Sequence, residues 1–187
     1  VSSSGVVASD TTGVGSARAA LSASGYGGDK AIFGFGSIVD YTSISNLVSN
    51  AGVVATDTTG VGLARNSLAG AGFGGDKAIF GFGFNDSKSN ITNLVSNAGV
   101  VATDTTGVGT ANGGRAASGY GGDKAIFGFG HDGSYSSSTN LVSNTGVVAT
   151  DTTGVGTTRT NLAAAGFGGG KAIFGFGYNN SYSNITN

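Results

Sequence analysis

The chain contains no cysteine, proline, methionine, tryptophan or glutamate, and it has a single histidine. Without cysteine it can form neither disulfide bonds nor thiolate metal sites. Charged residues make up only 10% of the chain and the formal net charge is −1, so we expect no surface for nucleic acid or anionic lipid. No apolar run approaches the roughly 20 residues of a membrane span. His131 stands in a variable polar segment with no recognisable catalytic partner, so we expect no enzyme, cofactor or metal.

Glycine is abundant, with 37 of 187 residues, and it recurs in a strict pattern. The segment GGDKAIFGFG begins at residues 27, 74 and 121, and GGGKAIFGFG begins at residue 168, so the interval is 47 residues. Low charge with frequent Val, Ile and Phe indicates a folded β protein with many turns rather than a disordered chain. The repeats 1–47, 48–94, 95–141 and 142–187 predict a single domain built from repeating units.

Each repeat contains four short segments with the composition of strands, bounded by Gly, Asn or Asp turns. In the second and third repeats these include NITNLVSN at residues 90–97 and GVVATD at residues 99–104. No segment has a helical apolar period, so we expect essentially no helix. Four strands per 40–50 residues are typical of a propeller blade. The sequence therefore predicts an all-β, four-bladed β-propeller of 47-residue, four-stranded blades.

Two details of the packing can be predicted from the repeat. Val1–Asp10 corresponds to the outermost strand of a repeat, and the chain stops in the strand just before it. We therefore expect this N-terminal strand to join the last blade and close the ring. Phe80 and Phe82 are two residues apart, which predicts that both face the same neighbouring blade. In a closed ring their counterparts in the other repeats would be equally buried.

The repeats resemble those of a known family. Residues 64–83, ARNSLAGAGFGGDKAIFGFG, and residues 158–177, TRTNLAAAGFGGGKAIFGFG, are similar to kelch-type repeats. Those repeats carry an Arg, a small-residue strand, a Gly-Lys turn and an aliphatic–aromatic strand that ends in Gly. The resemblance covers all four repeats and implies a β-propeller. The Gly-Gly doublet after that strand and the distal Trp of kelch repeats are missing.

The near-identical tandem form also resembles Gly-rich repeats of phage structural and tail proteins. This resemblance implies a component of a virion or an extracellular surface structure. The partners that it implies are other protein subunits, which include further copies of the chain.

Each repeat has one aspartate followed by Thr-Thr-Gly. Four identical carboxylates on a ring could bind a cation through oxygen ligands. Their expected place on the outer strand favours a structural interpretation, in which each side chain accepts hydrogen bonds from turn N–H groups or pairs with the repeat Arg. These aspartates are Asp10, Asp57, Asp104 and Asp151.

One repeat departs from the arginine pattern. Arg18, Arg65 and Arg159 occupy equivalent positions, whereas Asn112 stands there in the third repeat. Arg115 follows three residues later, where the other repeats have Leu. This departure predicts that the third blade is a weak point or a contact point.

The segments after FGFG differ between repeats and are rich in Tyr, Asn, Asp and Ser. Such residues make adaptable polar contacts and flat stacking surfaces. On a propeller they would share one face. The simpler interpretation is unconstrained variation in solvated loops, and the functional one is a binding face for a protein or a glycan. The candidate contact residues are Asp40, Tyr41, Phe84, Asn85, Asp86, Lys88, His131, Asp132, Tyr135, Tyr178, Asn179, Asn180 and Tyr182.

Two functions from different classes fit these features. The first is a non-enzymatic structural protein of an assembly, which uses a rigid propeller as a scaffold for protein–protein interaction. The second is a lectin-like or receptor-binding module that uses the variable loops.

Overall fold

The computed structural model describes residues 1–187 and consists of strands, turns and extended chain. Its strands form four small antiparallel sheets that recur along the chain at about 47 residues, together with one short ribbon. No segment forms a helix that is long and apolar enough to cross a membrane. The expectation of an all-β protein without helix is confirmed.

Each sheet is built in the order in which its strands occur in the chain. The first sheet contains β1 (Ser22–Tyr26), β2 (Lys30–Gly34) and β3 (Ser45–Val48). The second contains β4 (Ala69–Phe73), β5 (Lys77–Gly81) and β8 (Thr92–Val95), with the ribbon β6 (Phe84–Asn85) and β7 (Ser87–Lys88) between β5 and β8. The third contains β9 (Ala116–Tyr120), β10 (Lys124–His131) and β11 (Tyr135–Val142), and the fourth β12 (Ala163–Phe167) and β13 (Lys171–Gly175).

The GGDK segment, which is GGGK in the fourth repeat, forms the first hairpin turn of each repeat, as predicted. Tyr26 pairs with Lys30 across this turn. Gly27 and Gly28 have φ angles of +61° and +80°, a left-handed conformation that glycine adopts without steric cost. The turn is therefore fixed by backbone geometry that other residues would adopt only under strain.

A fourth extended segment lies along the outer edge of each of the first three sheets. Val54 pairs with Val48, and Thr58 pairs with Ser45, in isolated antiparallel bridges. The equivalent bridges recur in the second and third sheets. Four strand segments are therefore present in each of the first three units, and the structural units span residues 16–58, 63–105, 110–152 and 157–187. In the fourth unit Thr186 pairs with Gly175 of β13, and no segment occupies the outer position.

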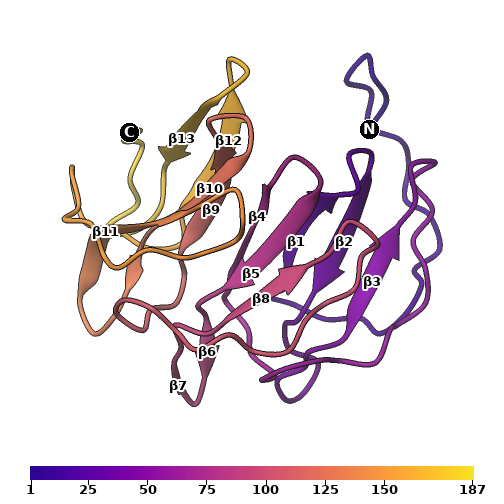
Figure 1. Ribbon diagram of the computed structural model, residues 1–187, viewed down its shortest axis with the longest axis horizontal. Coiled ribbons are helices and arrows are strands. Elements are labelled where there is room, and N and C mark those ends of the chain that lie inside the picture. The colour runs from indigo at the N-terminus through magenta and orange to yellow at the C-terminus, as the bar shows by residue number, and fades with distance from the viewer.

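The units lie side by side, with β1, β4, β9 and β12 as neighbours in that order. In Figure 1 the hairpin turns of all four units lie along the upper edge, and the β6–β7 ribbon lies at the opposite edge. Three backbone hydrogen bonds join each unit to the next, at equivalent positions in all three interfaces. In the first interface they run from Gly27 N–H to Asp76 C=O (2.7 Å), from Gly36 N–H to Arg65 C=O (3.0 Å) and from Ser67 N–H to Ala20 C=O (3.0 Å).

The apolar core lies between the units, because a single small sheet cannot bury both of its faces. The ring of Phe35 contacts that of Phe80 in the next unit, with centroids 5.5 Å apart. Phe82 contacts Phe127 in the unit after that, at 5.1 Å. The prediction that Phe80 and Phe82 face the same neighbour is therefore wrong. Phe82 has a φ of +64°, which ends the regular strand at Gly81 and turns its side chain toward the opposite side.

The row of units is open at both ends. Residues 1–10 are exposed, and their backbone hydrogen bonds are local, between Ser2, Gly5 and Val6. This segment does not pair with β13, so the closure expected from the sequence is absent in this arrangement. Phe80 is fully buried, whereas its counterpart Phe33 is 37% exposed, so the four Phe positions are not equivalent. In Figure 1 the N-terminus and the C-terminus lie at opposite sides of the row.

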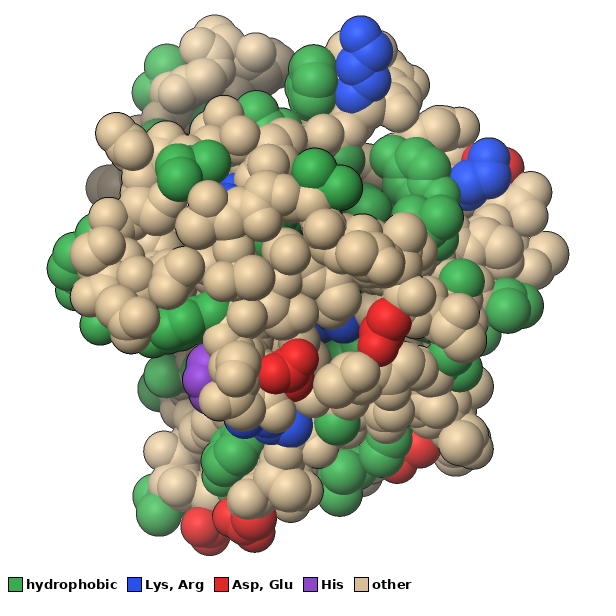
Figure 2. All heavy atoms as spheres, turned by 90° about the vertical axis from the view of Figure 1, so that its left-hand side faces the viewer, with side chains coloured by type: hydrophobic (Ala, Val, Ile, Leu, Met, Phe, Trp, Pro, Cys, Tyr) green, Lys and Arg blue, Asp and Glu red, His purple; other side chains and the backbone are tan.

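The surface carries few charges. Figure 2 shows the side of the molecule on which β11 and the C-terminus lie, where apolar groups alternate with uncharged polar surface. Long-range attraction between two proteins requires surfaces of opposite charge. Because this side carries few charges, contacts that it makes would depend on shape, apolar burial and backbone hydrogen bonds.

Candidate functional site

The variable segments form one edge of the molecule, which we call the loop edge (residues 37–45, 84–90, 131–138 and 178–184). Each segment folds back on itself, so that its first residue pairs with the fifth. Ser37 pairs with Tyr41, and Tyr178 pairs with Tyr182, as isolated bridges. The same pairing joins His131 to Tyr135 within the β10–β11 hairpin. The loops are therefore tight hairpins that follow or extend β2, β5, β10 and β13.

Six candidate residues stack along this edge in edge-to-face contacts. Tyr41 of the first unit contacts Phe84 of the second, with ring centroids 6.1 Å apart. In the other half, the centroid distances are 5.4 Å for His131 and Tyr135, 6.0 Å for Tyr135 and Tyr178, and 5.7 Å for Tyr178 and Tyr182. Lys88 stands where Tyr41 and Tyr135 stand in their units, and it separates the two halves of this aromatic ladder.

The remaining candidates do not converge on a common point. Asn85 donates a hydrogen bond to the Ala64 carbonyl, and Asp132 accepts one from the Ser134 N–H at 3.1 Å. Asp86 contributes its backbone N–H to the Tyr41 hydroxyl at 3.4 Å. Asp40, Asn179 and Asn180 make no side-chain hydrogen bond. The structure thus gathers the aromatic members of the predicted set and leaves its acidic and amide members scattered.

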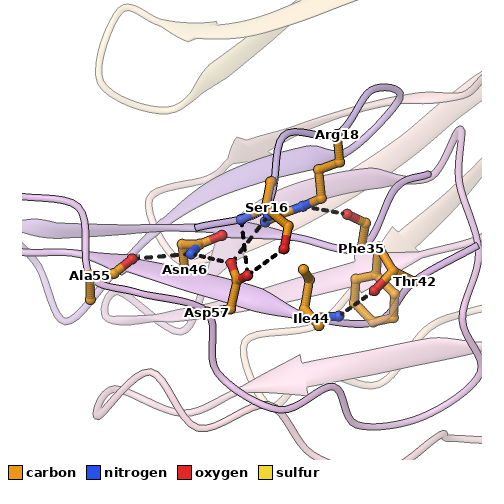
Figure 3. A network of polar contacts seen from close by, with 8 residues as sticks. All are labelled: Ser16, Arg18, Phe35, Thr42, Ile44, Asn46, Ala55 and Asp57. Carbon is orange, nitrogen blue, oxygen red and sulfur yellow. Dashed lines mark hydrogen bonds and ion pairs between the residues drawn. The ribbon is translucent and has the colours of Figure 1, made fainter. Parts of the chain in front are cut away.

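A second feature is a polar network that recurs inside each of the first three units, shown for the first unit in Figure 3. Asp57 on the outer segment accepts hydrogen bonds from the Ser16 N–H (2.9 Å), the Ser16 hydroxyl (2.7 Å) and the Asn46 amide (2.8 Å). Asn46 also donates to the Ala55 carbonyl at 3.1 Å. The donors Ser16 and Asn46, and then the charge of Arg18, lower the pKa of Asp57 below its ordinary value. The network fastens the outer segment to the beginning of the unit.

In the second unit the network extends into the core through a buried arginine. Arg65 is fully buried, and its Nε donates to the Phe82 carbonyl at 2.8 Å. Its Nη2 donates to Oδ1 of Asn93 at 2.8 Å. The guanidinium also lies 4.4 Å above the Phe35 ring of the preceding unit. Burial lowers the pKa of Arg65 to about 10, and the charge of Asp104 opposes that shift, so the group stays a cation at neutral pH.

The third unit reaches the same contacts from a different position. Arg115 lies 4.2 Å above the Phe82 ring, and its Nη1 donates to Oδ1 of Asn140 at 2.6 Å. The guanidinium therefore takes the place that Arg65 fills in the second unit. Asn112, at the usual arginine position, is fully buried, and neither atom of its amide has a hydrogen-bond partner. Arg115 therefore restores the contact with the Phe82 ring that an arginine at position 112 would make, and the Asn112 amide is left unsatisfied.

The structural interpretation of the repeated aspartates is confirmed for Asp57, Asp104 and Asp151. Asp104 accepts from the Leu63 N–H, and Asp151 accepts from the Thr110 N–H, both at 2.9 Å. Asp10 lies in the exposed N-terminal segment and makes no hydrogen bond or ion pair. The structure holds no group of three or more His, Cys, Asp or Glu side chains that could bind a metal ion.

Sequence reasoning missed the residue at the centre of this network. Asn46, Asn93 and Asn140 are all buried, and each donates a hydrogen bond to the aspartate of its unit. Asn93 and Asn140 also accept one from the arginine of their unit. A signal was present, because Asn stands directly before Leu-Val at the same place in the third strand of each of these repeats. A polar residue kept at a buried strand position indicates a hydrogen-bond network, since an unpaired amide there is costly.

The second glycine of the Thr-Thr-Gly-Val-Gly segment leaves room for that network. At Gly62, which has a φ of +79°, a Cβ atom would stand 2.3 Å from Oδ1 of Asp104 and 2.6 Å from Nδ2 of Asn93. Such distances are too short for any side chain. Gly62 is therefore required both by its backbone conformation and by the close approach of the carboxylate.

The hairpin turns of all four units border a shared hollow of about 440 Å³ at the edge opposite the loops. Four lysines at equivalent positions line it. Three of them pair with the aspartate before them, as Lys30 does with Asp29 at 3.0 Å. Lys171 follows Gly170 and lacks that partner. The lining lysines are Lys30, Lys77, Lys124 and Lys171.

Comparison with known proteins gave no assignment. No protein-family model matches the chain, and no curated protein matches it.

Proposed function

We propose that the chain is a structural building block, a rigid row of like units that takes part in a protein assembly of a virion or an extracellular surface. The observation that carries this proposal is the interface between units, which repeats three times with the same hydrogen bonds and the same ring contacts. An interface of this kind fixes the spacing of the units. The resemblance to Gly-rich repeats of phage structural proteins supports the same function.

A lectin-like or receptor-binding module is the second candidate, and the aromatic ladder favours it. Exposed aromatic faces provide stacking surfaces for sugar rings. Tyr182 is 93% exposed and Tyr178 is 36% exposed. However, most rings of the ladder lie edge-to-face on one another, so they hold neighbouring loops together. We therefore rank the structural role first.

A closed, kelch-like, four-bladed propeller is the alternative arrangement of the same units. The hollow that all four hairpin turns share favours it, because inner strands converge on the axis of a propeller. In that arrangement residues 1–10 would complete the fourth sheet of their own chain. It requires the two ends of the row to meet.

A glycan array with the wild-type chain and a Tyr135→Ala variant tests the choice between the two functions. We expect neither protein to bind a glycan, and we expect Tyr135→Ala to lower the free energy of unfolding by about 1 kcal/mol through loss of its ring contacts. Tyr120→Ala, at the opposite edge, is the matched control. A glycan bound by the wild type and by Tyr120→Ala, and lost in Tyr135→Ala, would overturn the structural role in favour of the lectin-like one.

A further inference from the structure

The two ends of the row expose matching halves of the interface that joins the units inside it. The fourth unit ends in a trailing face, on which Phe167 is 51% and Phe176 60% exposed. The first unit begins with a leading face, on which Phe33 is 37% exposed. Inside the row the counterparts of Phe176 and Phe33 are Phe35 and Phe80, which are buried against each other. Each end therefore presents the surface that the other would cover.

The backbone at the two ends is complementary in the same way. Each internal interface joins three backbone groups of one unit to three of the next. At each end of the row the three equivalent groups have no hydrogen-bond partner. Their positions are equivalent to those joined at every internal interface. On the trailing face they are the Gly168 N–H, the Gly177 N–H and the Asn161 C=O, and on the leading face the Asp29 C=O, the Arg18 C=O and the Ala20 N–H.

The polar network of the fourth unit is also half formed. Arg159 donates to Oδ1 of Asn187, as Arg65 does to Asn93. The aspartate that completes the network in the other units is missing here, and the Thr157 N–H that would bind it has no acceptor. Asp10 is an aspartate of the same repeat position, and its side chain has no partner.

We propose that the trailing face of one copy of this chain binds the leading face of a second copy, head to tail. Residues 1–10 of the second copy then lie along the open outer edge of the fourth unit, where Asp10 accepts hydrogen bonds from Asn187 and Thr157. A second copy fits because its leading face can repeat the geometry that the three internal interfaces share, and Figure 1 shows the two ends of the row at opposite sides. Continuing the row adds a unit at the same spacing.

This contact is heterologous, since two different faces meet. It places Arg18 of the second copy over the Phe176 ring, as Arg65 lies over Phe35 at 4.4 Å. The inference rests on the proposed role in an assembly and names the partner.

Two single-cysteine variants test the contact directly, because the natural chain has no cysteine. In the first interface the Ser22 hydroxyl oxygen lies 2.9 Å from the place of a Cβ on Gly70. Ala163 and Ala23 occupy the equivalent positions on the trailing and leading faces, and both are exposed. Ala23→Cys and Ala163→Cys, mixed and oxidised, should give the mixed dimer in at least about tenfold excess over either symmetric dimer, because only the head-to-tail contact brings these thiols within disulfide range.

Asp10→Asn, introduced into the Ala23→Cys chain, should lower the yield of mixed dimer about tenfold, through loss of charge-assisted hydrogen bonds. Asp86→Asn is the matched control, since Asp86 is exposed and its side chain makes no hydrogen bond. Equal yields for the two aspartate variants would overturn the place assigned to Asp10. Random proportions of the three dimers would overturn the head-to-tail contact.

The double variant Ala23→Cys/Ala163→Cys distinguishes a second copy from closure within one chain. We expect a ladder of covalently linked oligomers. A compact cross-linked monomer would overturn the proposal in favour of the closed ring. The cross-linking results decide only whether the partner is a second copy. The assembly role itself is tested separately, by the glycan array with Tyr135→Ala.

Discussion

Phe80→Ala is expected to lower the free energy of unfolding by roughly 3–5 kcal/mol, the range for truncation of a fully buried aromatic side chain. The Phe80 ring is completely buried and fills the space between two sheets. It contacts Phe35 edge to face, and Gly34 and Gly70 approach it so closely that a Cβ on either would stand about 3 Å from its ring. No neighbour can move into the cavity without changing the backbone of both strands. Denaturant unfolding of the purified variant measures the loss.

Phe33→Ala is the matched control in a dilute sample. Phe33 has the same place in its repeat and is 37% exposed, so its truncation should cost about half as much or less. Equal losses for the two variants would contradict the open row, because they would mean that the leading face of the first unit is covered.

Asn93→Ala is the second change with a large expected effect, about 3 kcal/mol, because it leaves the buried Nη2 group of Arg65 without an acceptor and breaks the network around it. Asn93 is fully buried, accepts from Arg65, and donates to Asp104 at 2.9 Å and to the Ala102 carbonyl at 3.1 Å. Its removal breaks all three hydrogen bonds at once. Equilibrium unfolding in urea measures the loss.

Asn112→Ala separates this network from the cost of cavity formation. Asn112 is as deeply buried as Asn93, but neither atom of its amide is hydrogen-bonded. Removing an unsatisfied amide is expected to change stability by no more than about 1 kcal/mol in either direction. If the two variants lost the same stability, the Asp–Asn–Arg network would not be the reason that Asn93 matters.

The strands and turns could be predicted from the sequence because local residues determine them. Paired glycines specify the hairpin turn through their left-handed φ, and the alternation of small and apolar residues specifies β1 and β4. The direction in which each Phe points could not be predicted in this way. Phe82 adopts a φ of +64°, which non-glycine residues rarely do, so regular strand alternation assigned it to the wrong neighbour.

Near-identical repeats also hide which unit contacts which. Residues that recur at every interval fit a closed ring and an open row equally well, so the expected closure by residues 1–10 had no support beyond the repeat itself. The loop edge was found because variation among otherwise constant repeats is visible in the sequence. Its aromatic ladder was not, since Tyr135 and Tyr178 meet across an interface between two units.

The exchange at Asn112 and Arg115 shows why the units resemble each other so closely. Arg65, Arg115 and Arg159 each contact a Phe of the preceding unit and an Asn of their own unit. A change in one unit therefore has to preserve the contact with the unit beside it. The third unit satisfies that requirement by supplying the guanidinium from a position three residues further along the chain.

Amide hydrogen exchange in dilute solution tests the central claim, that four like units are joined by one repeated interface and leave both ends open. The N–H groups of Gly27, Gly74 and Gly121 donate across the three interfaces at 2.7–2.8 Å, whereas the equivalent Gly168 N–H has no acceptor. We predict slow exchange at the first three and fast exchange at Gly168, because protection follows the stability of the hydrogen bond. Fast exchange at all four would show that the units are not joined in this way, and slow exchange at Gly168 in the monomer would show that the row is closed.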